Sequence, residues 1–454
     1  MNGARMSQTG LETSPPSTVS WEQLQEHQVA MFRDLQNRLT QHEVWRSRIG
    51  HLQPVDAYAA LRDVPFTTKH DLRDAQVEPD PTKPLGAFQL ASTDQLVQIT
   101  SSSGTTGAPT YFGVTANDLD RWRAGIGNAY RTAGVEPGTI VALTTGMAIV
   151  AGGMPYADGI RSAGGALAWI GGQTTARMAT AMQRLRVSVL VATASFATHF
   201  ANRCEELLGV PAPELAVRTV IAGGEPGAGV PHIRQSILDA WGATRVSEFM
   251  GLGDVLPALW AECEAGGGMH FTAAPDVLVE LIDPETHEHV PWEPGATGEA
   301  IYTTLTREAC PVVRFRSGDQ LLVTGVECAC GRTAPTVRCV GRTDDMLIYK
   351  AMNVYPSSIR EVVLDTASDV LSGTMRIRKE TKDQVRFDTP LPLEVELREG
   401  LDAATAEGPL RAAADAVSER LRVRVAIEPR THGEIPISDY KNALTYVEGT
   451  NPYA

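Results

Sequence analysis

A run of small and hydroxyl-bearing residues between positions 100 and 110 is the first feature that could do chemistry. Glycine and short hydroxyl side chains leave backbone N–H groups open, and such groups can surround a chain of phosphates. Apolar segments at 96–99 and 111–114 favour an ordered hairpin over a flexible connector. The run lacks the Gly-Lys-Ser/Thr ending of a Walker-type loop, which disfavours a kinase. The expected phosphate ligands are Ser102, Ser103, Gly104, Thr105, Thr106 and Gly107.

The cysteines form a second, separate signal. Four side chains offer three thiolates and one imidazole, a ligand set suited to tetrahedral Zn²⁺. They are Cys263, His270, Cys328 and Cys330. Free cysteines are also common core fillers, so the Cys-x-Cys pair alone is weak evidence. Because no coordination position would remain open, we expect a structural zinc that joins loops and takes no part in catalysis.

Alternating strand and helix patterns must position these residues. Apolar runs at 139–143, 187–191 and 218–221 each precede small-residue turns, with helical patterns between them. This alternation predicts an α/β fold with a largely parallel sheet. Near the N-terminus, apolar residues from Leu24 to Leu39 recur at helical spacing and predict an amphipathic helix after Trp21.

The C-terminal part has a different pattern. Strands are expected at 375–378, 393–397 and 422–427, and one helix face is expected at Leu410, Ala414, Val417 and Leu421. This predicts a small α+β unit that acts as a lid. The expected organisation is a disordered leader at 1–18, a large nucleotide- and acid-binding domain at 19–343 and a lid domain at 344–454.

Composition limits the classes of function. The 454 residues are 43% hydrophobic and carry a formal net charge of −14. Such a length and apolar content suit a globular protein of two or more domains. The negative charge disfavours nucleic acid as a partner. No apolar stretch reaches the roughly 18–20 residues of a membrane span, and the polar leader is unlike a signal peptide, so we expect a cytoplasmic protein and no membrane partner.

The Ser/Thr/Gly run and several later segments together resemble the adenylate-forming superfamily of acyl-CoA synthetases, adenylation domains and luciferases. Within it, the chain most resembles the phenylacetate-CoA ligase branch from about Pro65 to Asn442. Seven segments agree in order, so the likeness is specific. They include 65–69 with 71–73, 102–110, 223–226, 250–254, 311–319, 330–333 with 341–348, and 353–356.

The resemblance implies ATP as a cosubstrate and assigns nucleotide contacts. It places the adenine-side turn at Gly223, Gly224, Glu225 and Pro226, followed by Met250 and Gly251. Asp319 would bind the ribose hydroxyls, since one carboxylate has two acceptor oxygens for a diol. Arg342 would approach the ribose and α-phosphate. Asp254 stands where the family has Glu and would hold Mg²⁺, a hard cation suited to carboxylate oxygen.

Lys441 is the implied adenylation lysine. A lone lysine near a C-terminus is usually solvated surface, but the family lysine lies in a similar loop after a Pro-x-Ser step. An ammonium there can bridge the attacking carboxylate and the α-phosphate. Lys441 would lie on the mobile C-terminal unit, with the hinge at Asp344-Asp345.

The resemblance also implies an acyl pocket of small residues. Its expected lining is Thr145, Gly146, Met147, Ala222, Gly223, Gly251, Leu252, Gly253 and Pro257. Small residues replace bulkier ones of the family at 146–148, so the floor could admit a substituted ring. We therefore expect a hydroxy- or amino-benzoate-like acid as substrate.

The acyl acceptor and the other function classes stay open. CoA is the default acceptor, but Lys350-Ala351 replaces the family's Arg-Gly, and an added methyl could forbid a positive φ at Ala351. A carrier-protein thiol, or a small hydroxyl or amine, is the alternative. A non-catalytic nucleotide-binding protein and a phosphotransferase are alternatives of other classes. The sequence does not decide whether the protein is a homodimer.

Overall fold

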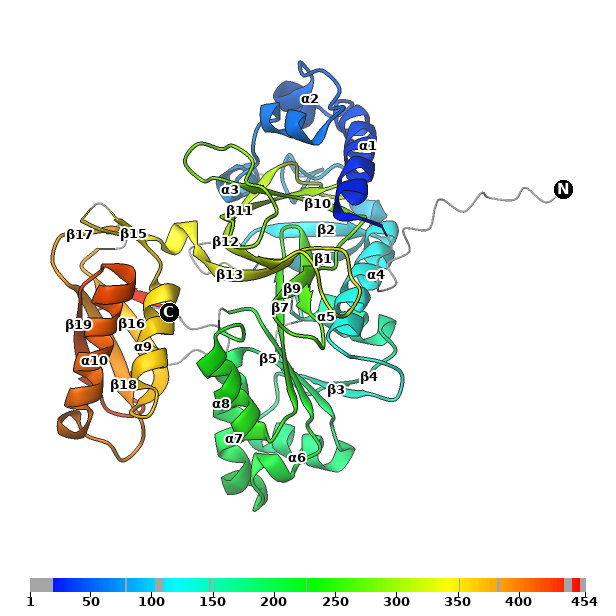
Figure 1. Cartoon of the computed structure of the whole chain (residues 1–454). Helices are drawn as coiled ribbons and strands as arrows, with labels where there is room; N and C mark the ends of the chain where they lie inside the picture. The colour runs from blue at the N-terminus through cyan, green and yellow to red at the C-terminus, as the bar shows by residue number, and fades with distance from the viewer. Residues whose placement is uncertain are drawn as a thin grey trace.

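The protein has a larger part built on one long sheet and a smaller C-terminal part beside it (Figure 1). The computed structural model describes residues 19–77, 80–102, 109–146, 148–150, 152–225, 227–350, 352–381, 384–436 and 443–449. Residues 103–108 of the Ser/Thr/Gly run, together with Met147, Pro226 and Lys441, therefore lie outside the described residues.

The central sheet has eleven strands in the order β10-β11-β12-β13-β9-β8-β7-β6-β5-β3-β4. Their bounds are β3 (Ile140–Leu143), β4 (Ala166–Trp169), β5 (Val189–Ala192), β6 (Thr219–Gly223), β7 (Arg245–Leu252), β8 (Leu256–Glu262), β9 (Met269–Phe271), β10 (Val277–Ile282), β11 (Thr297–Thr304), β12 (Phe315–Gly325) and β13 (Thr336–Arg342). The five strands from β4 to β7 are parallel, and every pairing from β7 to β10 is antiparallel. The expected α/β class with mixed and parallel sheets is confirmed, and the parallel pairing that the strand–helix alternation predicted is confined to β4, β3, β5, β6 and β7.

Helices cover the sheet, and their ends follow from local sequence. The helices of the larger part are α1 (Trp21–Leu39), α2 (Glu43–Ile49), α3 (Lys69–Val77), α4 (Ala116–Thr132), α5 (Met154–Ser162), α6 (Thr175–Leu185), α7 (Ala194–Leu208) and α8 (Pro231–Trp241). Ser20 caps α1 in a capping box with Gln23, which satisfies two otherwise unpaired N–H groups. Gly209 and Gly242 end α7 and α8 with positive φ, a conformation that glycine adopts without strain.

The expected hairpin around the Ser/Thr/Gly run is present. β1 (Leu96–Ser101) pairs antiparallel with β2 (Tyr111–Thr115). Ser101 also donates its backbone N–H to the carbonyl of Ile149, 2.9 Å away. The pairing holds Ser101 opposite Tyr111, so both described ends of the run lie side by side.

The C-terminal part is an α+β unit on two small sheets. Its strands are β14 (Leu347–Tyr349), β15 (Met352–Val354), β16 (Leu371–Lys379), β17 (Arg386–Phe387), β18 (Leu391–Leu397), β19 (Val425–Arg430) and β20 (Thr445–Val447), with helices α9 (Pro356–Ala367) and α10 (Ala403–Leu421). The sheet orders are β15-β14-β17 and β19-β18-β16-β20. On α10 the buried side chains include Leu410 and Val417, so the predicted apolar face forms in part.

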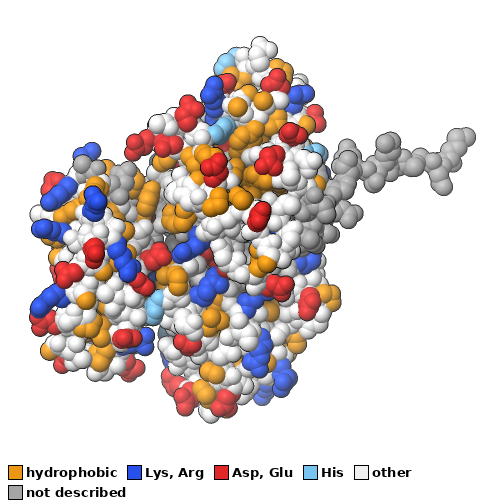
Figure 2. All heavy atoms as spheres, viewed as in Figure 1, with side chains coloured by type: hydrophobic (Ala, Val, Ile, Leu, Met, Phe, Trp, Pro, Cys, Tyr) orange, Lys and Arg blue, Asp and Glu red, His pale blue; other side chains and the backbone are white. Residues whose placement is uncertain are grey.

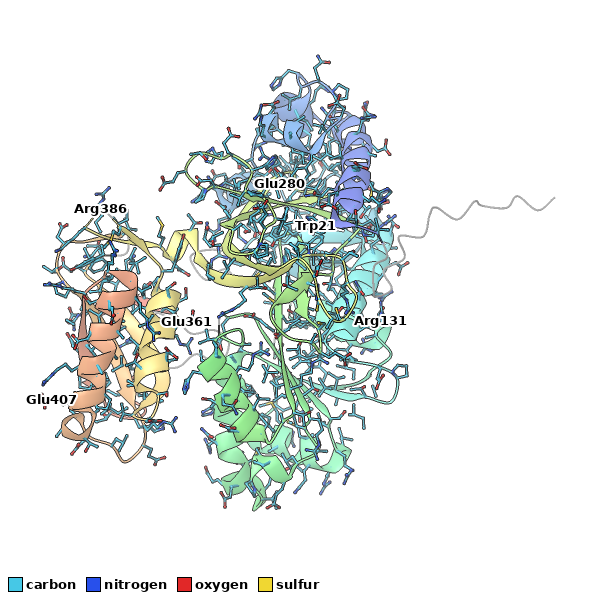
Figure 3. The ribbon with its side chains drawn as sticks, in the orientation of Figure 1. Trp21, Arg131, Glu280, Glu361, Arg386 and Glu407 are labelled. Carbon is cyan, nitrogen blue, oxygen red and sulfur yellow. The ribbon has the colours of Figure 1, made fainter. Side chains whose placement is uncertain are left out.

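Side chains of α9 connect this unit to β13 of the larger part. Ser357 Oγ donates to the carbonyl of Val340 at 2.7 Å, and Glu361 approaches Arg338 at 3.5 Å. Glu361 lies on the side of α9 that faces the larger part (Figure 3). A Cβ at Gly341 would lie 2.6 Å from the ring of Tyr355, so the end of β13 abuts the start of α9.

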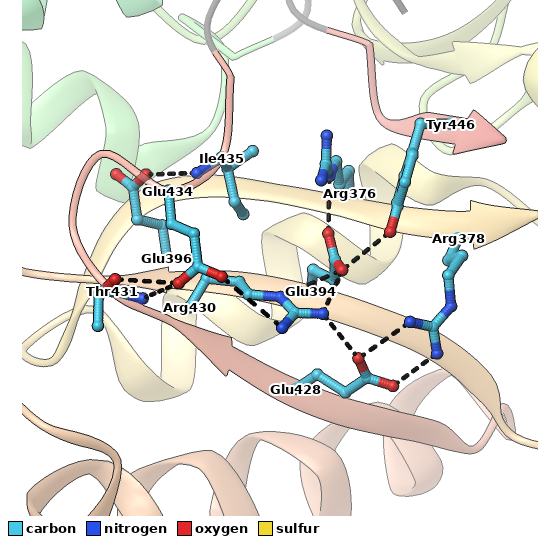
Figure 4. A network of polar contacts seen from close by, with 10 residues as sticks. All are labelled: Arg376, Arg378, Glu394, Glu396, Glu428, Arg430, Thr431, Glu434, Ile435 and Tyr446. Atoms are coloured by element: carbon cyan, nitrogen blue, oxygen red, sulfur yellow. Dashed lines mark hydrogen bonds and ion pairs between the residues drawn. The ribbon is translucent and has the colours of Figure 1, made fainter. Parts of the chain in front are cut away.

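Buried ion pairs organise the four-stranded sheet of the C-terminal unit (Figure 4). Glu394 accepts from Arg376 Nε at 2.8 Å, from Arg430 and from the Tyr446 hydroxyl at 2.8 Å. These contacts lower the pKa of Glu394 although burial opposes the shift. The carboxylate of Glu394 therefore joins β16, β19 and β20 to β18.

The face of the molecule in Figure 2 carries Lys/Arg and Asp/Glu side chains of both signs, interspersed over both parts. Among the described residues, we find no helix with the length and apolar character that crossing a bilayer requires.

Candidate functional site

A lysine and an aspartate form the centre of the candidate site. Lys69 Nζ lies 2.6 Å from Oδ1 and 2.8 Å from Oδ2 of Asp254. Asp254 is the predicted Mg²⁺ ligand and is 4% exposed. Burial lowers the pKa of the Lys69 ammonium, and the charge of Asp254 opposes that shift. Lys69 belongs to a segment that matches the family, but its pairing with Asp254 could not be predicted from the sequence, because the two residues are 185 positions apart.

Backbone pairing fixes Lys69 in place. Thr67 donates its N–H to the carbonyl of Arg314 at 3.1 Å and accepts from the N–H of Arg316 at 2.9 Å. Arg314 in turn binds the carbonyls of Arg62 and Val64 and forms a buried ion pair with Glu280. Lys69 follows directly as the first residue of α3. The arginine-rich segment at 311–319 therefore holds the lysine segment in register.

Asp254 is held by its neighbours as well. Arg307 donates from Nη1 to the backbone carbonyl of Asp254 at 2.8 Å. Thr110 Oγ1 donates to Asp254 Oδ1 at 3.3 Å, and the hydroxyls of Thr110 and Ser102 are 2.8 Å apart. A continuous line of polar contacts thus joins Lys69 through Asp254 to Ser102, where the Ser/Thr/Gly run begins. The run's other predicted ligands, Ser103 to Gly107, lie outside the described residues.

The predicted ribose ligand and the predicted arginine are neighbours. Asp319 on β12 stands opposite Arg342 on β13 in the antiparallel register. Arg342 Nη1 donates to Asp319 Oδ1 at 2.6 Å, and its Nη2 donates to the carbonyl of Ser317 at 3.1 Å. Arg342 is the last residue of β13, so its guanidinium lies where the chain passes into the C-terminal unit.

The predicted adenine-side turn follows β6. A Cβ on Gly223 would lie 2.5 Å from the carbonyl of Phe249, and Gly224 has φ +85°, so both positions suit glycine. Glu225 accepts from the backbone N–H of Ser195 at 2.6 Å, at the start of α7. Pro226 lies outside the described residues.

Glu248 is a buried carboxyl beside this turn that the sequence analysis missed. It pairs in register with Ala222 on β7 and β6. Burial raises the pKa of Glu248 to about 7, and the charge of Glu262 adds to the shift. A buried carboxyl with a raised pKa, two residues before Met250, is a typical feature of functional sites.

The predicted acyl-pocket residues lie on two segments that approach one another. A Cβ on Gly251 would lie 1.9 Å from the carbonyl of Pro257, so only glycine fits there. A Cβ on Gly152 would lie 3.3 Å from Thr145 Oγ1 and 4.0 Å from the ring of Tyr156. Gly146 lies against Gly172, Leu252 is half-buried, Gly253 is buried, and Ala222 packs in the core of α7 and α8. Met147 lies outside the described residues.

Three aromatic rings lie between these two segments. Tyr130, Tyr156 and Phe249 have centroids 5.0–5.9 Å apart. The hydroxyl of Tyr156 donates to the carbonyl of Pro257 at 3.3 Å. The three residues come from α4, α5 and β7, which are distant in sequence, so no local sequence pattern could have predicted the cluster.

The four predicted metal ligands converge. Their ligand atoms all lie within 4.8 Å of one another, with 3.6 Å between the sulfurs of Cys263 and Cys328. Cys330 Sγ is 3.4 Å from Nε2 of His270. Cys263 follows β8, His270 lies in β9, and the other two precede β13. The cluster therefore links three neighbouring regions of the antiparallel half of the sheet.

The cluster fits zinc by geometry and by ligand chemistry. Tetrahedral bonds of about 2.3 Å to sulfur and about 2.0–2.1 Å to nitrogen imply ligand separations of roughly 3.5–3.8 Å. The carbonyl of Ala334 lies 3.1 Å from His270 Nδ1 and can only accept, so the ring's proton lies there and Nε2 is free to bind a metal. Burial also lowers the pKa of His270, which keeps the imidazole neutral.

The segment joining the two parts departs from the sequence expectation in one detail. Lys350 adopts φ 51°, the left-handed conformation that most side chains disfavour. Ala351, where a positive φ was in question, lies outside the described residues, as does the predicted catalytic Lys441.

Relatives in sequence agree on one enzyme family. The chain is 32% identical to the phenylacetate-coenzyme A ligase of Thermus thermophilus over 323 residues, which are 70% of this chain and 69% of that enzyme. It is 30% identical to the phenylacetate-coenzyme A ligase of Pseudomonas putida over 372 residues, 77% of each chain. The corresponding enzyme of Escherichia coli is 29% identical over 366 residues, 78% of this chain and 79% of that one. No protein-family model matches the chain.

Solved structures share the fold. A 2-hydroxyisobutyryl-CoA ligase in the postadenylation state, in complex with 2-HIB-AMP, superposes with a TM-score of 0.85 at 24% identity over 96% of this chain and 91% of that one. The same ligase in the thioesterification state superposes with a TM-score of 0.67 at 24% identity and the same coverage. With 32% identity over 70% of its length to a named member, the chain belongs to the phenylacetate-CoA ligase family of AMP-forming acid-CoA ligases.

Proposed function

We propose that this protein activates an aryl carboxylic acid with ATP, forming an acyl-adenylate and pyrophosphate, and then transfers the acyl group to CoA. The observation that carries the proposal is the line of contacts from Lys69 through Asp254 and Thr110 to Ser102. It brings a cation and a carboxylate to the start of a hydroxyl-rich run, where the charges of a triphosphate could be met.

The chain's own residues have distinct roles in this reaction. Ser102 and the hydroxyl and backbone donors of 103–107 bind the β- and γ-phosphates. Asp319 accepts hydrogen bonds from the ribose hydroxyls, and Arg342 is directed toward the ribose and the α-phosphate. The ammonium of Lys441 meets the negative charge that builds up as the carboxylate attacks phosphorus. Asp254 would hold Mg²⁺, which when bound neutralises phosphate charge and polarises the phosphorus.

A division of the chain near residue 344 is part of the proposal. Residues 344–454 act as a lid that brings Lys441 to the nucleotide for adenylation and turns away for acyl transfer. Two polar contacts between α9 and β13, the Ser357 hydroxyl on the Val340 carbonyl and an ion pair, are of a kind that a moving lid could break and remake. The ion pair of Arg338 with Glu361 is long at 3.5 Å and partly exposed.

A hydroxy- or amino-benzoate-like acid is the proposed substrate. The relatives named above are phenylacetate ligases, which favours an aryl acid. The half-buried ring of Tyr156, which packs against the buried rings of Tyr130 and Phe249, offers a surface against which a substrate ring could pack.

CoA is the proposed acceptor, and a non-CoA nucleophile is the second candidate. The residues that favour the second candidate are Lys350 and Ala351, in the segment where the family has Arg-Gly. The left-handed backbone at Lys350 shows that the turn there is made without glycine. A bulkier turn would narrow the approach of a pantetheine arm.

A structural zinc is also proposed, bound by Cys263, His270, Cys328 and Cys330. The ion would join β8, β9 and the segment before β13, and with four protein ligands it would leave no position for substrate.

A panel of aryl and aliphatic acids tests the proposed function. Pyrophosphate release and AMP formation are measured with the purified full chain, with and without CoA. We expect AMP and pyrophosphate with at least one aryl acid and a thioester when CoA is present. Release of ADP, or no turnover with any acid, would contradict the proposal. Adenylate formation with no thioester would favour the non-CoA nucleophile.

A further inference from the structure

The hydroxyl of Tyr130 is buried and has no hydrogen-bond partner in the described part of the chain. Tyr130 is 0% exposed. Burial also raises the pKa of its hydroxyl well above the usual value, so the group stays a neutral donor and acceptor. Buried polar groups are almost always hydrogen-bonded, so an orphan hydroxyl calls for an explanation.

The surroundings of Tyr130 belong to the candidate acyl pocket. Its ring is 5.0 Å from that of Phe249 and 5.9 Å from that of Tyr156. Tyr156 reaches the carbonyl of Pro257 with its hydroxyl and approaches the Thr145 segment at Gly152. Tyr130 therefore packs against two aromatic side chains, and one of them, Tyr156, lies near residues of both predicted walls.

The position along the sheet indicates which end of a substrate Tyr130 would meet. Phe249 lies three residues before the end of β7, which is roughly 10 Å along the strand. Asp254, beside the phosphate-binding run, lies beyond that end. Tyr130 is in the last turn of α4, and helical side chains lean toward the helix N-terminus. A carboxylate held near the phosphates would thus leave the far end of an aryl acid toward Tyr130.

We propose that the Tyr130 hydroxyl hydrogen-bonds a hydroxyl or amino substituent at the end of the substrate ring remote from its carboxylate. This assignment rests on the proposed function and makes Tyr130 a specificity-determining residue. An acid without the substituent would leave the buried hydroxyl unpartnered. The lost hydrogen bond would lower kcat/KM for that acid relative to the substituted acid.

Matched pairs of acids test the assignment with the full chain. The pairs are 4-hydroxybenzoate and 4-aminobenzoate against benzoate, and 4-hydroxyphenylacetate against phenylacetate. The value of kcat/KM for pyrophosphate release is compared in the wild type and Tyr130→Phe. We expect the wild type to prefer a substituted acid. Tyr130→Phe should lower kcat/KM for that acid about tenfold and change the unsubstituted partner less than twofold.

Tyr58→Phe serves as the matched control, because its hydroxyl donates to the carbonyl of Val279 on β10, outside the candidate acyl pocket. It should not change the ratio between the paired acids. A wild type without preference, or a Tyr130→Phe variant that affects both acids equally, overturns the assignment of Tyr130 while turnover of aryl acids still supports the proposed function. Absence of pyrophosphate release with every acid in the wild type overturns both.

Discussion

Lys69 and Asp254 form a nearly symmetric ion pair, with 2.6 Å and 2.8 Å between the ammonium nitrogen and the two carboxylate oxygens. The ammonium occupies one side of the carboxylate that is proposed to hold Mg²⁺. Since the pair lies at the start of the phosphate-binding run, the lysine can neutralise Asp254 before metal and nucleotide arrive.

Removing the charge of Lys69 should make the stability of the protein depend on Mg²⁺ bound at Asp254. Lys69→Met leaves a buried carboxylate with only the weak donor Thr110, so we expect the free energy of unfolding to fall by about 2 kcal/mol. Millimolar Mg²⁺ should restore more stability in this variant than in the wild type, as measured by thermal unfolding. Lys69→Arg, which keeps the charge, is the control. A Lys69→Met variant as stable as the wild type without Mg²⁺ would contradict this interpretation of the pair.

Zinc should be retained through purification at about one ion per chain. Cys330→Ala removes one ligand and should release the metal and lower the melting temperature by several degrees. The control is Cys204→Ala, whose buried thiol donates to the carbonyl of Phe200 within α7, far from the cluster in sequence. Metal analysis of the three proteins decides the question. A zinc-free wild type whose Cys263 and Cys328 are freely alkylated in the folded state would rule the site out.

The buried carboxyl of Glu248 should make stability depend on pH. Its pKa of about 7 in the folded state lies above the usual value near 4.5, so the folded state binds the proton more tightly. The resulting stabilisation is full below about pH 4.5 and is lost as the pH rises through 7. Glu248→Gln should therefore be more stable than the wild type at pH 8, by up to about 3 kcal/mol, and close to it in stability near pH 4.5.

Thermal unfolding without nucleotide across that pH range measures this effect. The exposed Glu205→Gln variant should show no such difference from the wild type. If Glu248→Gln were less stable than the wild type by the same amount at pH 4.5 and at pH 8, the carboxylate of Glu248 would be ionised in a satisfied hydrogen-bond network, contrary to this account.

Gly251 is required for the close approach of β7 and β8. Because a Cβ would lie 1.9 Å from the carbonyl of Pro257, Gly251→Ala must displace backbone, and we expect a loss of about 2 kcal/mol or more together with weakened adenylation. Gly408→Ala is the control, since that position in α10 has open space and alanine favours helices. Equal unfolding temperatures for Gly251→Ala and the wild type would show that the pocket wall is adjustable.

Local sequence patterns predicted much of the fold. The runs at 139–143, 187–191 and 218–221 became β3, β5 and β6, and the hairpin of β1 and β2 formed around the Ser/Thr/Gly run. These elements are predictable because periodicity and turn residues are local properties. The antiparallel half of the sheet was missed, because strands such as β8 and β10 are buried on both faces and lack an alternating pattern.

In the candidate site, too, some residues were predictable from local sequence motifs and others were not. Asp319 and Arg342 were assigned through motif likeness, and the structure places them in contact. The pairing of Lys69 with Asp254 spans 185 residues, and the Tyr130 cluster joins α4, α5 and β7. Contacts of this kind depend on tertiary packing, and neither composition nor spacing in one sequence encodes them visibly.

The most direct test of the central claim is acid-dependent exchange of labelled pyrophosphate into ATP by the wild type and Lys441→Ala. The wild type should exchange in the presence of an aryl acid. Lys441→Ala should lose exchange by several orders of magnitude while still binding ATP, and the exposed-lysine control Lys83→Ala should exchange normally. Exchange by Lys441→Ala at the wild-type rate, or none by the wild type with any acid, would contradict the account.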